Sequence, residues 1–304
     1  MDLTVRPART DDADEVAAFT RETWPERGLE DYLPDVFPEW VRTDGEHQRT
    51  LVAETADAVV GCAQVLLLSD YEAWCQGMRV APQARGQGVG RRLTDACFRW
   101  ARERGAVVAR NLVFSWNAEA LGLSRAAGFS PVTEFRWAYP VPDPDAAPDG
   151  RVSADPAAAW AFWSDSDANA VLHGLALDLD EAWALAQLTR PALERAAEET
   201  ALIVVGNGRT RGMTFRNRQF ERETDAGTER WAEYGATAWR DAAGADRLLT
   251  AVRRDAGRLG ADRARVLIPE TARAVTDAAA ARVDLSDGPD VVLGADLTGI
   301  DPGR

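Results

Sequence analysis

The feature that most constrains this chain is a glycine-rich turn that joins a strand signal to a helix signal. The strand Met78–Val80 leads into the turn, and Gly86, Gly88 and Gly90 alternate along it before a helix that continues from Arg91. Glycine lets the backbone adopt positive φ angles and approach a ligand closely. The first N–H groups of a helix lack internal partners and lie at the positive end of the helix dipole. The turn therefore predicts a site for a phosphate or pyrophosphate.

Several kinds of structure share such a turn. A Walker P-loop needs a lysine after the glycines, and here all 35 basic residues are arginine. A dinucleotide-binding turn needs the spacing GxGxxG and an acidic residue after the second strand, and this sequence has neither. The pyrophosphate of coenzyme A fits the spacing, and a glycine-rich connection that binds nothing is the plain alternative.

Charge and composition exclude several other classes. The net charge of −14 disfavours nucleic acid as a partner, because an acidic chain repels phosphate backbones. No apolar run approaches the roughly 20 residues of a membrane-spanning helix, and no signal peptide is seen, so we expect a cytoplasmic protein. The excess of Ala, Arg and Asp and the absence of Lys suggest a GC-rich bacterial genome. Three cysteines without a CxxC pair and two histidines predict no metal site and no disulfide framework.

The order of strand and helix signals suggests two domains of the α/β (α+β) class. Three strands, a helix, a strand, a helix and a strand follow one another in the first half, and the second half repeats that order with little residue identity. In the second half we also expect a helix over residues 180–188 and a hairpin of Ala201–Val205 with Arg211–Arg216. Residues 141–150 are rich in proline and aspartate, which favours a linker. We therefore expect domains at residues 1–140 and 151–304.

A second segment sharpens the interpretation of the turn. Residues 117–129 read Asn-Ala-Glu-Ala-Leu-Gly-Leu-Ser-Arg-Ala-Ala-Gly-Phe. Together with the motif Arg85-x-x-Gly88-x-Gly90, this segment resembles the GCN5-related N-acetyltransferase (GNAT) superfamily. The resemblance covers most of residues 1–140. In order and at this spacing, the two motifs are a specific signal.

The resemblance implies a mixed, mostly antiparallel sheet that is flanked by helices and opens beside Met78–Val80. It also implies that acetyl-CoA is the acyl donor, held at the opening without a metal. Exposed strand N–H and C=O groups there await a partner. The expected coenzyme-binding residues are Met78, Arg79, Val80, Arg85, Gly86, Gln87, Gly88, Val89, Gly90, Arg91 and Asn117.

The catalytic acid and base are less well defined. Many relatives carry a tyrosine in the helix after Asn117, placed to protonate the leaving thiolate, and this chain has Ser124 there. A serine hydroxyl is a much poorer acid than a phenol. Leu112 and its neighbours stand where some relatives place a glutamate base. We list as catalytic candidates Asn117, Ser124, Glu54 and Glu72, since an attacking amine must lose a proton.

Charge is divided unevenly within the first half. Residues 1–77 hold six arginines and seventeen acidic residues, whereas residues 78–140 hold ten arginines and four acidic residues. This division suits a cationic amine that meets an anionic donor, although a generally acidic surface explains it as well. The expected acceptor-binding residues are Tyr32, Asp70, Tyr71, Trp74 and Trp116, with Glu30, Asp31, Asp35, Trp24 and Trp40 as further candidates.

The second half lacks the features of a coenzyme site. Its corresponding connection, residues 240–246, has one glycine and carries Asp241 and Asp246, which would repel a phosphate. We therefore expect a degenerate GNAT-like domain there, with an unrelated α/β domain as the alternative. The predicted function is N-acetylation of a small-molecule amine by a monomer or homodimer. The rival functions are a non-catalytic coenzyme-A-binding sensor and an aminoacyl-tRNA-dependent transferase.

Overall fold

The computed structural model describes residues 2–21, 23, 31–224 and 227–300. These residues form two compact units. The first unit consists of residues 1–113, 117–131 and 292–304, and the second of residues 114–116 and 132–291. The C-terminal residues thus belong to the unit that the N-terminus begins. No helix within the described ranges is both long enough and apolar enough to cross a bilayer.

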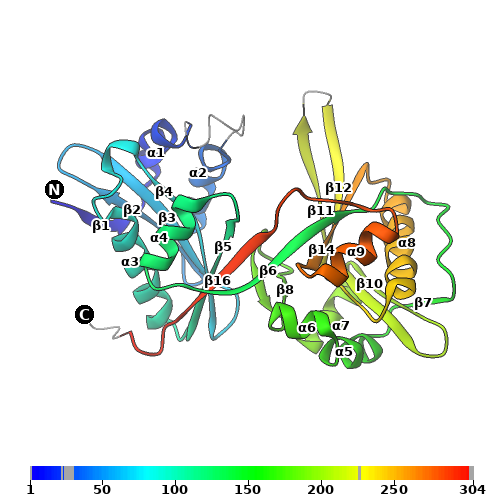
Figure 1. Cartoon of the computed structure of the whole chain (residues 1–304). Helices are drawn as coiled ribbons and strands as arrows, with labels where there is room; N and C mark the ends of the chain where they lie inside the picture. The colour runs from blue at the N-terminus through cyan, green and yellow to red at the C-terminus, as the bar shows by residue number, and fades with distance from the viewer. Residues whose placement is uncertain (1, 22, 24–30, 225–226, 301–304) are drawn as a thin grey trace. The chain divides into compact units, whose positions relative to one another are not determined.

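The first unit contains one mixed sheet with helices on both faces (Figure 1). The sheet order is β1 to β5 and then β16, with antiparallel pairing from β1 to β4 and parallel pairing between β4 and β5. The strands are β1 (Thr4–Pro7), β2 (Gln48–Glu54), β3 (Val59–Leu67), β4 (Glu72–Val80), β5 (Val108–Phe114) and β16 (Asp290–Asp296). The helices are η1 (Thr10–Asp12), α1 (Ala13–Thr20), α2 (Leu33–Thr43), η3 (Pro82–Ala84), α3 (Val89–Glu103) and α4 (Ala118–Ala126).

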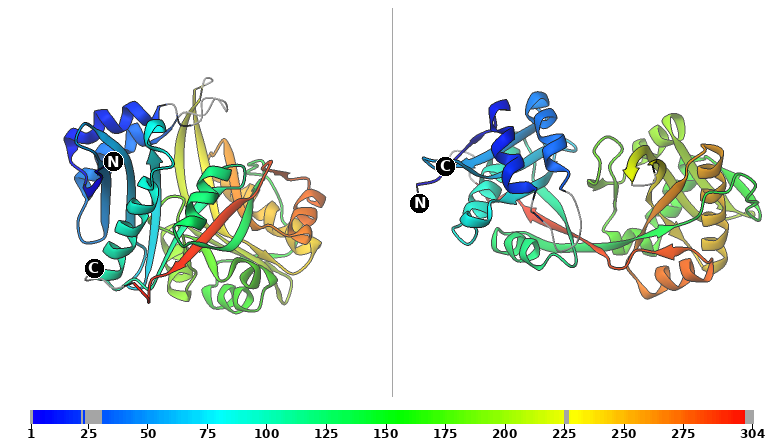
Figure 2. Two further views of the ribbon diagram at one scale, coloured as in Figure 1. Left: turned by 60° about the vertical axis from the view of Figure 1, so that its left-hand side comes forward. Right: turned by 90° about the horizontal axis from the view of Figure 1, so that it is seen from above.

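Apolar side chains on alternate strand positions fix which helices cover which face. Val52 of β2 and Cys62 of β3 pack against Val16, Leu33 and Phe37 of α1 and α2. Helix α3 is amphipathic and buries Leu93, Cys97 and Trp100, and it covers the opposite face of the sheet with α4 (Figures 1 and 2). Trp100 is buried, as its helical spacing predicts.

The second unit repeats the order of strands and helices that the sequence predicts. Its sheet order is β6, β14, β12, β11, β10 and β7, with β13 beside β11 and β15 beside β6. The strands are β6 (Ser130–Tyr139), β7 (Arg151–Ser153), β10 (Ala201–Gly206), β11 (Thr210–Thr224), β12 (Gly227–Ala236), β13 (Ala238–Trp239), β14 (Arg263–Pro269) and β15 (Asp284–Leu285). The helices are α5 (Pro156–Ser164), α6 (Asp167–Leu172), α7 (Arg190–Glu199), α8 (Ala242–Arg258) and α9 (Ala272–Ala280).

Two sequence expectations for this half differ from the structure. The predicted helix over residues 180–188 is wrong, because β9 (Leu185–Gln187) pairs there with β8 (Leu175–Leu177) in a separate two-stranded sheet. Residues 141–150 belong to the second unit and lie along α8: the N–H of Asp143 donates to the carbonyl of Arg253 at 2.9 Å. Arg247 donates to Asp149 at 2.8 Å. The prolines prevent regular structure in this segment, but they do not prevent it from packing.

Candidate functional site

Strands β4 and β5 diverge within the first unit. Their parallel ladder joins only Glu72, Ala73 and Trp74 to Val108, Ala109 and Arg110. From Cys75 to Val80, β4 continues beside β3 while its ladder with β5 has ended. We call this divergence the splay. It confirms the opening beside Met78–Val80 that the family resemblance implied, and it places strand-edge groups where an extended ligand can pair with them.

A β-bulge lies on the β4 side of the splay. The β3–β4 register shifts between Cys62–Arg79 and Gln64–Gln76, so β4 carries one extra residue there. Gly77 has a φ of +63°, and a Cβ atom on it would come within 2.6 Å of the Trp40 ring. Only glycine satisfies both the positive φ and the close approach of the indole. The bulge turns the β4 backbone locally, as bulges beside active sites often do.

The glycine-rich turn follows β4 directly and leads into α3. Gly86 and Gly88 have φ angles of +72° and +79°, so both need the left-handed conformation that glycine tolerates. Gly88 is the N-cap of α3, and no side chain caps the helix. Across the residues that the structure describes, no hydrogen bond takes the N–H groups of residues 86–91. These unpaired donors form a cradle for an anion at the positive end of the helix dipole.

The third glycine has a different role. A Cβ atom on Gly90 would lie 2.7 Å from the Leu123 side chain, so Gly90 lets α3 and α4 pack closely. Asn117 caps α4, because its Oδ1 accepts from the N–H of Ala120 at 3.1 Å. Ser124 lies buried further along α4. The second motif of the sequence therefore brings α4 against the start of the phosphate-binding helix.

Arginines add positive charge at the mouth of the cradle. Arg85 and Arg91 are exposed, and Arg85 lies 3.6 Å from the exposed carboxylate of Glu119, a pair that solvent screens strongly. Arg92 is directed elsewhere and donates to the carbonyl of Leu3 at 2.9 Å. Arg85 and Arg91 are thus available to an anionic ligand.

The side chain of Arg79 makes an ion pair within the first unit. Its guanidinium makes two hydrogen bonds to the buried carboxylate of Asp31, at 2.7 and 3.1 Å, and lies 5.7 Å from the Tyr32 ring centroid. Tyr32 is about half exposed and meets Trp40 edge to face. Since Trp40 covers Gly77, these rings form a wall beside the bulge. The carboxylate of Asp31 is buried and paired with Arg79. The candidates Trp24 and Glu30 lie outside the described residues.

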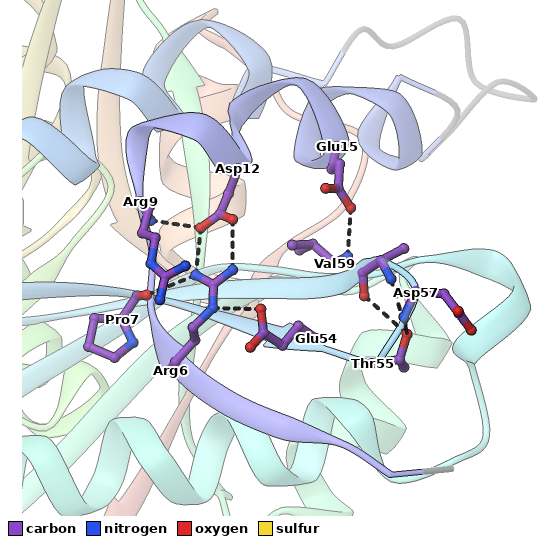
Figure 3. A network of polar contacts seen from close by, with 10 residues as sticks. Arg6, Pro7, Arg9, Asp12, Glu15, Glu54, Thr55, Asp57 and Val59 are labelled. Carbon is purple, nitrogen blue, oxygen red and sulfur yellow. Dashed lines mark hydrogen bonds and ion pairs between the residues drawn. The ribbon is translucent and has the colours of Figure 1, made fainter.

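Glu54 is held far from the splay. Arg6 donates to Glu54 at 2.6 Å and to Asp12 at 2.8 Å, in the network that Figure 3 shows between β1, β2 and η1. In the sheet order, β3 and β4 separate this network from β5. This ion pair with Arg6, on the far side of β3 and β4 from β5, does not favour the predicted role of Glu54 as a base, which stays a prediction.

Glu72 and Trp74 lie in the closed part of the β4–β5 pair. Glu72 is 2% exposed and accepts from the Arg110 guanidinium at 2.5 Å. Trp74 is 1% exposed, so it packs in the core and presents no surface to an acceptor. Neither placement favours the predicted role, because an arginine-paired carboxylate inside a sheet is a poor base and a covered indole offers a ligand little surface; both roles stay predictions.

Three further candidates are placed away from the wall. Asp70 and Tyr71 lie in the turn before β4, at the end of the strand opposite the glycine-rich turn. Burial and the nearby Glu72 carboxylate raise the pKa of Tyr71, which makes its phenol a weaker acid. Trp116 stacks on Phe114 with ring centroids 5.3 Å apart, and both residues belong to the second unit.

A polar ladder that the sequence did not reveal crosses the sheet on the face covered by α2. Gln76 donates to Gln64 at 2.8 Å, Gln64 contacts the Thr50 hydroxyl at 3.4 Å, and Thr50 donates to Asp44 at 3.0 Å. Burial raises the pKa of Asp44. Glutamine at alternate positions of apolar strands was the available signal, and it becomes informative only once the register is known.

The equivalent junction in the second unit is closed. Strands β12 and β14 pair from Trp231–Arg263 to Ala236–Leu267 without diverging. Helix α8 begins with Asp241, whose carboxylate accepts from the N–H of Gly244 at 2.8 Å and from Arg211 at 2.8 Å. A side-chain carboxylate therefore occupies the helix N-terminus that the first unit leaves open.

Comparisons with known proteins agree with this geometry. Residues 13–129 match the family model "Acetyltransferase (GNAT) family". Two curated relatives are similar to the first unit. Aminoglycoside N(6′)-acetyltransferase type 1 of Klebsiella aerogenes is 27% identical over 140 residues, which cover 43% of this chain and 92% of that protein. Streptothricin acetyltransferase of Streptomyces lavendulae is 38% identical over 112 residues, which cover 32% of this chain and 57% of that protein.

One solved structure is similar over nearly the whole chain. A GCN5-related N-acetyltransferase from Sphaerobacter thermophilus has a TM-score of 0.62 at 18% identity, and the match covers 98% of this chain and 97% of that one. At this identity the likeness concerns the fold. Residues 13–129 therefore form an acetyltransferase domain of the GNAT family, which makes this protein a transferase.

Proposed function

We propose that this protein transfers an acetyl group from acetyl-CoA to the amine of a small cationic molecule. The observation that carries the proposal is the combination, within the GNAT domain, of the splay with the uncapped N-terminus of α3. The first offers a strand edge to the donor's pantetheine arm, and the second offers N–H groups to its pyrophosphate.

The donor site is assigned to the first unit. The N–H groups of residues 86–91 hold the pyrophosphate, and Arg85 and Arg91 add positive charge. The arm then runs back along β4 from Val80 toward the bulge at Gly77. A backbone N–H near Val80 stabilises the oxyanion that develops on the thioester carbonyl.

The reaction is a direct attack. The amine nitrogen forms a bond to the carbonyl carbon, the C–S bond breaks, and the coenzyme leaves as a thiolate. The attacking amine gives up a proton, and the thiolate takes one up. Because Arg6 and Arg110 hold Glu54 and Glu72, we assign the first proton to water. Ser124, or a water that it holds, supplies the second.

The acceptor wall is assigned to Tyr32 and Trp40 beside the bulge. Two observations support a cationic acceptor. Residues 1–77 carry eleven more acidic than basic side chains, and the two curated relatives are named for aminoglycoside and streptothricin acetylation. A field of one sign concentrates ligands of the opposite charge. The second unit is assigned a structural role as a degenerate GNAT-like domain, since Asp241 fills its helix N-terminus.

The test is turnover. The full chain is incubated with acetyl-CoA and an aminoglycoside or streptothricin, and the released thiol is followed with a thiol reagent. We expect amine-dependent thiol release that saturates in both substrates and is lost in Gly88→Glu. Binding of acetyl-CoA without turnover for any amine in a broad panel would contradict the proposal and favour a coenzyme-A-binding sensor.

A further inference from the structure

Asn111 stands at the deepest point of the splay. It is the first residue of β5 after the last ladder pair, Trp74–Arg110. Its side chain extends toward α4, where Nδ2 donates to the hydroxyl oxygen of the buried Ser124 at 3.0 Å. The rest of β5 is largely apolar, so a polar side chain at this position calls for a reason.

The other half of the same amide has no partner. The Oδ1 atom of Asn111 is buried, and within the described ranges nothing donates a hydrogen bond to it. Buried polar atoms in folded proteins are nearly always satisfied, because leaving one unpaired costs free energy. Among the buried side-chain atoms of the first unit that lack a partner, this is the one acceptor in the part that the structure describes; the other is the donor Nε1 of Trp100. An N–H or O–H from outside the protein would satisfy this oxygen.

The proposed donor offers one such group at this depth. Residues 75–80 of β4 span about 20 Å at roughly 3.3 Å per residue, and the pyrophosphate cradle lies beyond Val80. An extended arm that starts at the cradle reaches the apex with its far end. That end carries a thioester, whose acetyl group has no hydrogen-bond donor, and an amide N–H two carbons from the sulfur. This N–H is the last donor on the arm.

We propose that Asn111 recognises the arm of the acyl donor, with Oδ1 accepting a hydrogen bond from the amide N–H nearest to the thioester sulfur. Nδ2 keeps its bond to Ser124, so one side chain links the bound arm to the α4 hydroxyl. The inference rests on the proposed function, because it takes an acyl-CoA as the ligand. It specifies the ligand class as thioesters of an amide-bearing arm.

The test is a thermodynamic cycle by calorimetry on the full chain. One ligand is acetyl-CoA, and the other is an analogue with CH₂ in place of that amide N–H. The unaltered chain is expected to bind acetyl-CoA about five- to tenfold more tightly than the analogue, as one neutral hydrogen bond allows. Asn111→Leu should bind both ligands equally, with the affinity that the unaltered chain shows for the analogue.

The controls separate recognition from packing. Asn217→Leu is a matched control in the second unit: Nδ2 of Asn217 donates to Glu233 and its buried Oδ1 likewise lacks a partner among the described residues, so this variant should keep the full discrimination. If Asn111→Leu is less stable to heat than the unaltered chain, Asn111→Ala takes its place in the cycle. The comparison of the two ligands on the unaltered chain needs no variant at all. Equal binding of both ligands by the unaltered chain, or undiminished discrimination by Asn111→Leu, would overturn the inference. If the unaltered chain bound neither acetyl-CoA nor the analogue, acetyl-CoA as the proposed donor would be overturned as well. This result would be seen before any variant is made.

Discussion

The two parallel strand pairs of this protein show how a binding site differs from a closed copy of the same architecture. In the first unit, β4 and β5 share three ladder positions and then separate. In the second unit, β12 and β14 stay paired from Trp231 to Ala236. Each pair is followed by a connection and a long helix, α3 or α8.

The connections that lead into α3 and α8 also differ, one being open and the other closed. Gly88 begins α3 with no side-chain cap, whereas Asp241 begins α8 and satisfies both an N–H and Arg211. At this junction the second unit pairs its strands and caps its helix with its own groups. The first unit leaves donors unsatisfied until a ligand arrives, so the site consists largely of backbone groups that the fold does not use.

The largest expected effect is the loss of donor binding in Gly88→Glu. Gly88 has a φ of +79°, and the new carboxylate would stand in the anion cradle, so we expect acetyl-CoA affinity to fall at least a thousandfold, about 4 kcal/mol. Calorimetry measures it. Gly208→Glu is a matched control: Gly208 has a φ of +76°, is equally open and lies in a second-unit turn, so the variant adds the same strain and charge. Equal losses in both variants would contradict the assigned site.

The closed unit should depend on its buried charges. Glu233 is 1% exposed and accepts from Arg218 at 2.8 Å and from Arg265 at 2.6 Å. Glu233→Ala leaves two guanidinium groups without their carboxylate and should lower the free energy of unfolding by about 3–5 kcal/mol. Chemical denaturation measures it. Glu229→Ala breaks a partly exposed pair with Arg263 and should cost about 1 kcal/mol or less. If Glu233→Ala lowered the free energy of unfolding only slightly, the ion pairs of Glu233 with Arg218 and Arg265 would contribute little to the stability of the second unit.

A buried acid of the second unit should give it an unusual pH dependence. Burial raises the pKa of Asp290 to about 6, although Trp137 donates to it. The unfolded chain returns it to about 4. Between pH 4 and 6 the native state therefore binds more protons, and stability falls as pH rises through this window, by up to about 3 kcal/mol. Denaturation curves of Asp290→Asn should lose this decline.

The first unit supplies a contrasting acid. Burial alone would raise the pKa of Asp12, but hydrogen bonds from Arg6 and the backbone of Arg9 lower it. Its contribution to stability is present above about pH 4 and is lost as pH falls below that value. Asp12→Asn should therefore remove the loss of unfolding free energy that the unaltered chain shows as pH falls below 4. Asp290→Asn should instead remove the decline of unfolding free energy as pH rises from 4 to 6. If both variants changed the pH dependence in the same direction, the assignment of these two acids would be wrong.

The smallest predicted effect is at the closed helix start. Asp241→Ala removes the cap of α8 and should cost about 1 kcal/mol of unfolding free energy. It should create no second site for acetyl-CoA, because β12 and β14 remain paired. Asp246→Ala removes the same charge from an exposed position of the same helix and should cost almost nothing. A second binding event in Asp241→Ala would mean that the carboxylate alone closes the second unit.

Sequence reasoning found what local chemistry determines. The glycine-rich turn and the hairpin of β10 and β11 are encoded by neighbouring residues, and both predictions are confirmed. The predicted helix at residues 180–188 is wrong because a three-residue strand carries no measurable periodicity.

Partners distant in sequence were beyond reach. Glu54 meets Arg6 across 48 residues, and Glu72 meets Arg110 across 38, so neither carboxylate could be excluded as a base from sequence. The return of residues 292–300 to the first unit has no local signal either. Asn111 did have one, as a polar residue in an apolar strand, but its meaning needed the end of the β4–β5 ladder.

Hydrogen–deuterium exchange of the full chain with and without acetyl-CoA tests the central claim most directly. We predict slower exchange on addition of acetyl-CoA for the amides of residues 75–80 and 86–91, and no change for residues 231–236, which are already paired with β14. Protection of β12 and the start of α8, or none at β4 and the glycine-rich turn, would contradict the assignment of an open first unit and a closed second one.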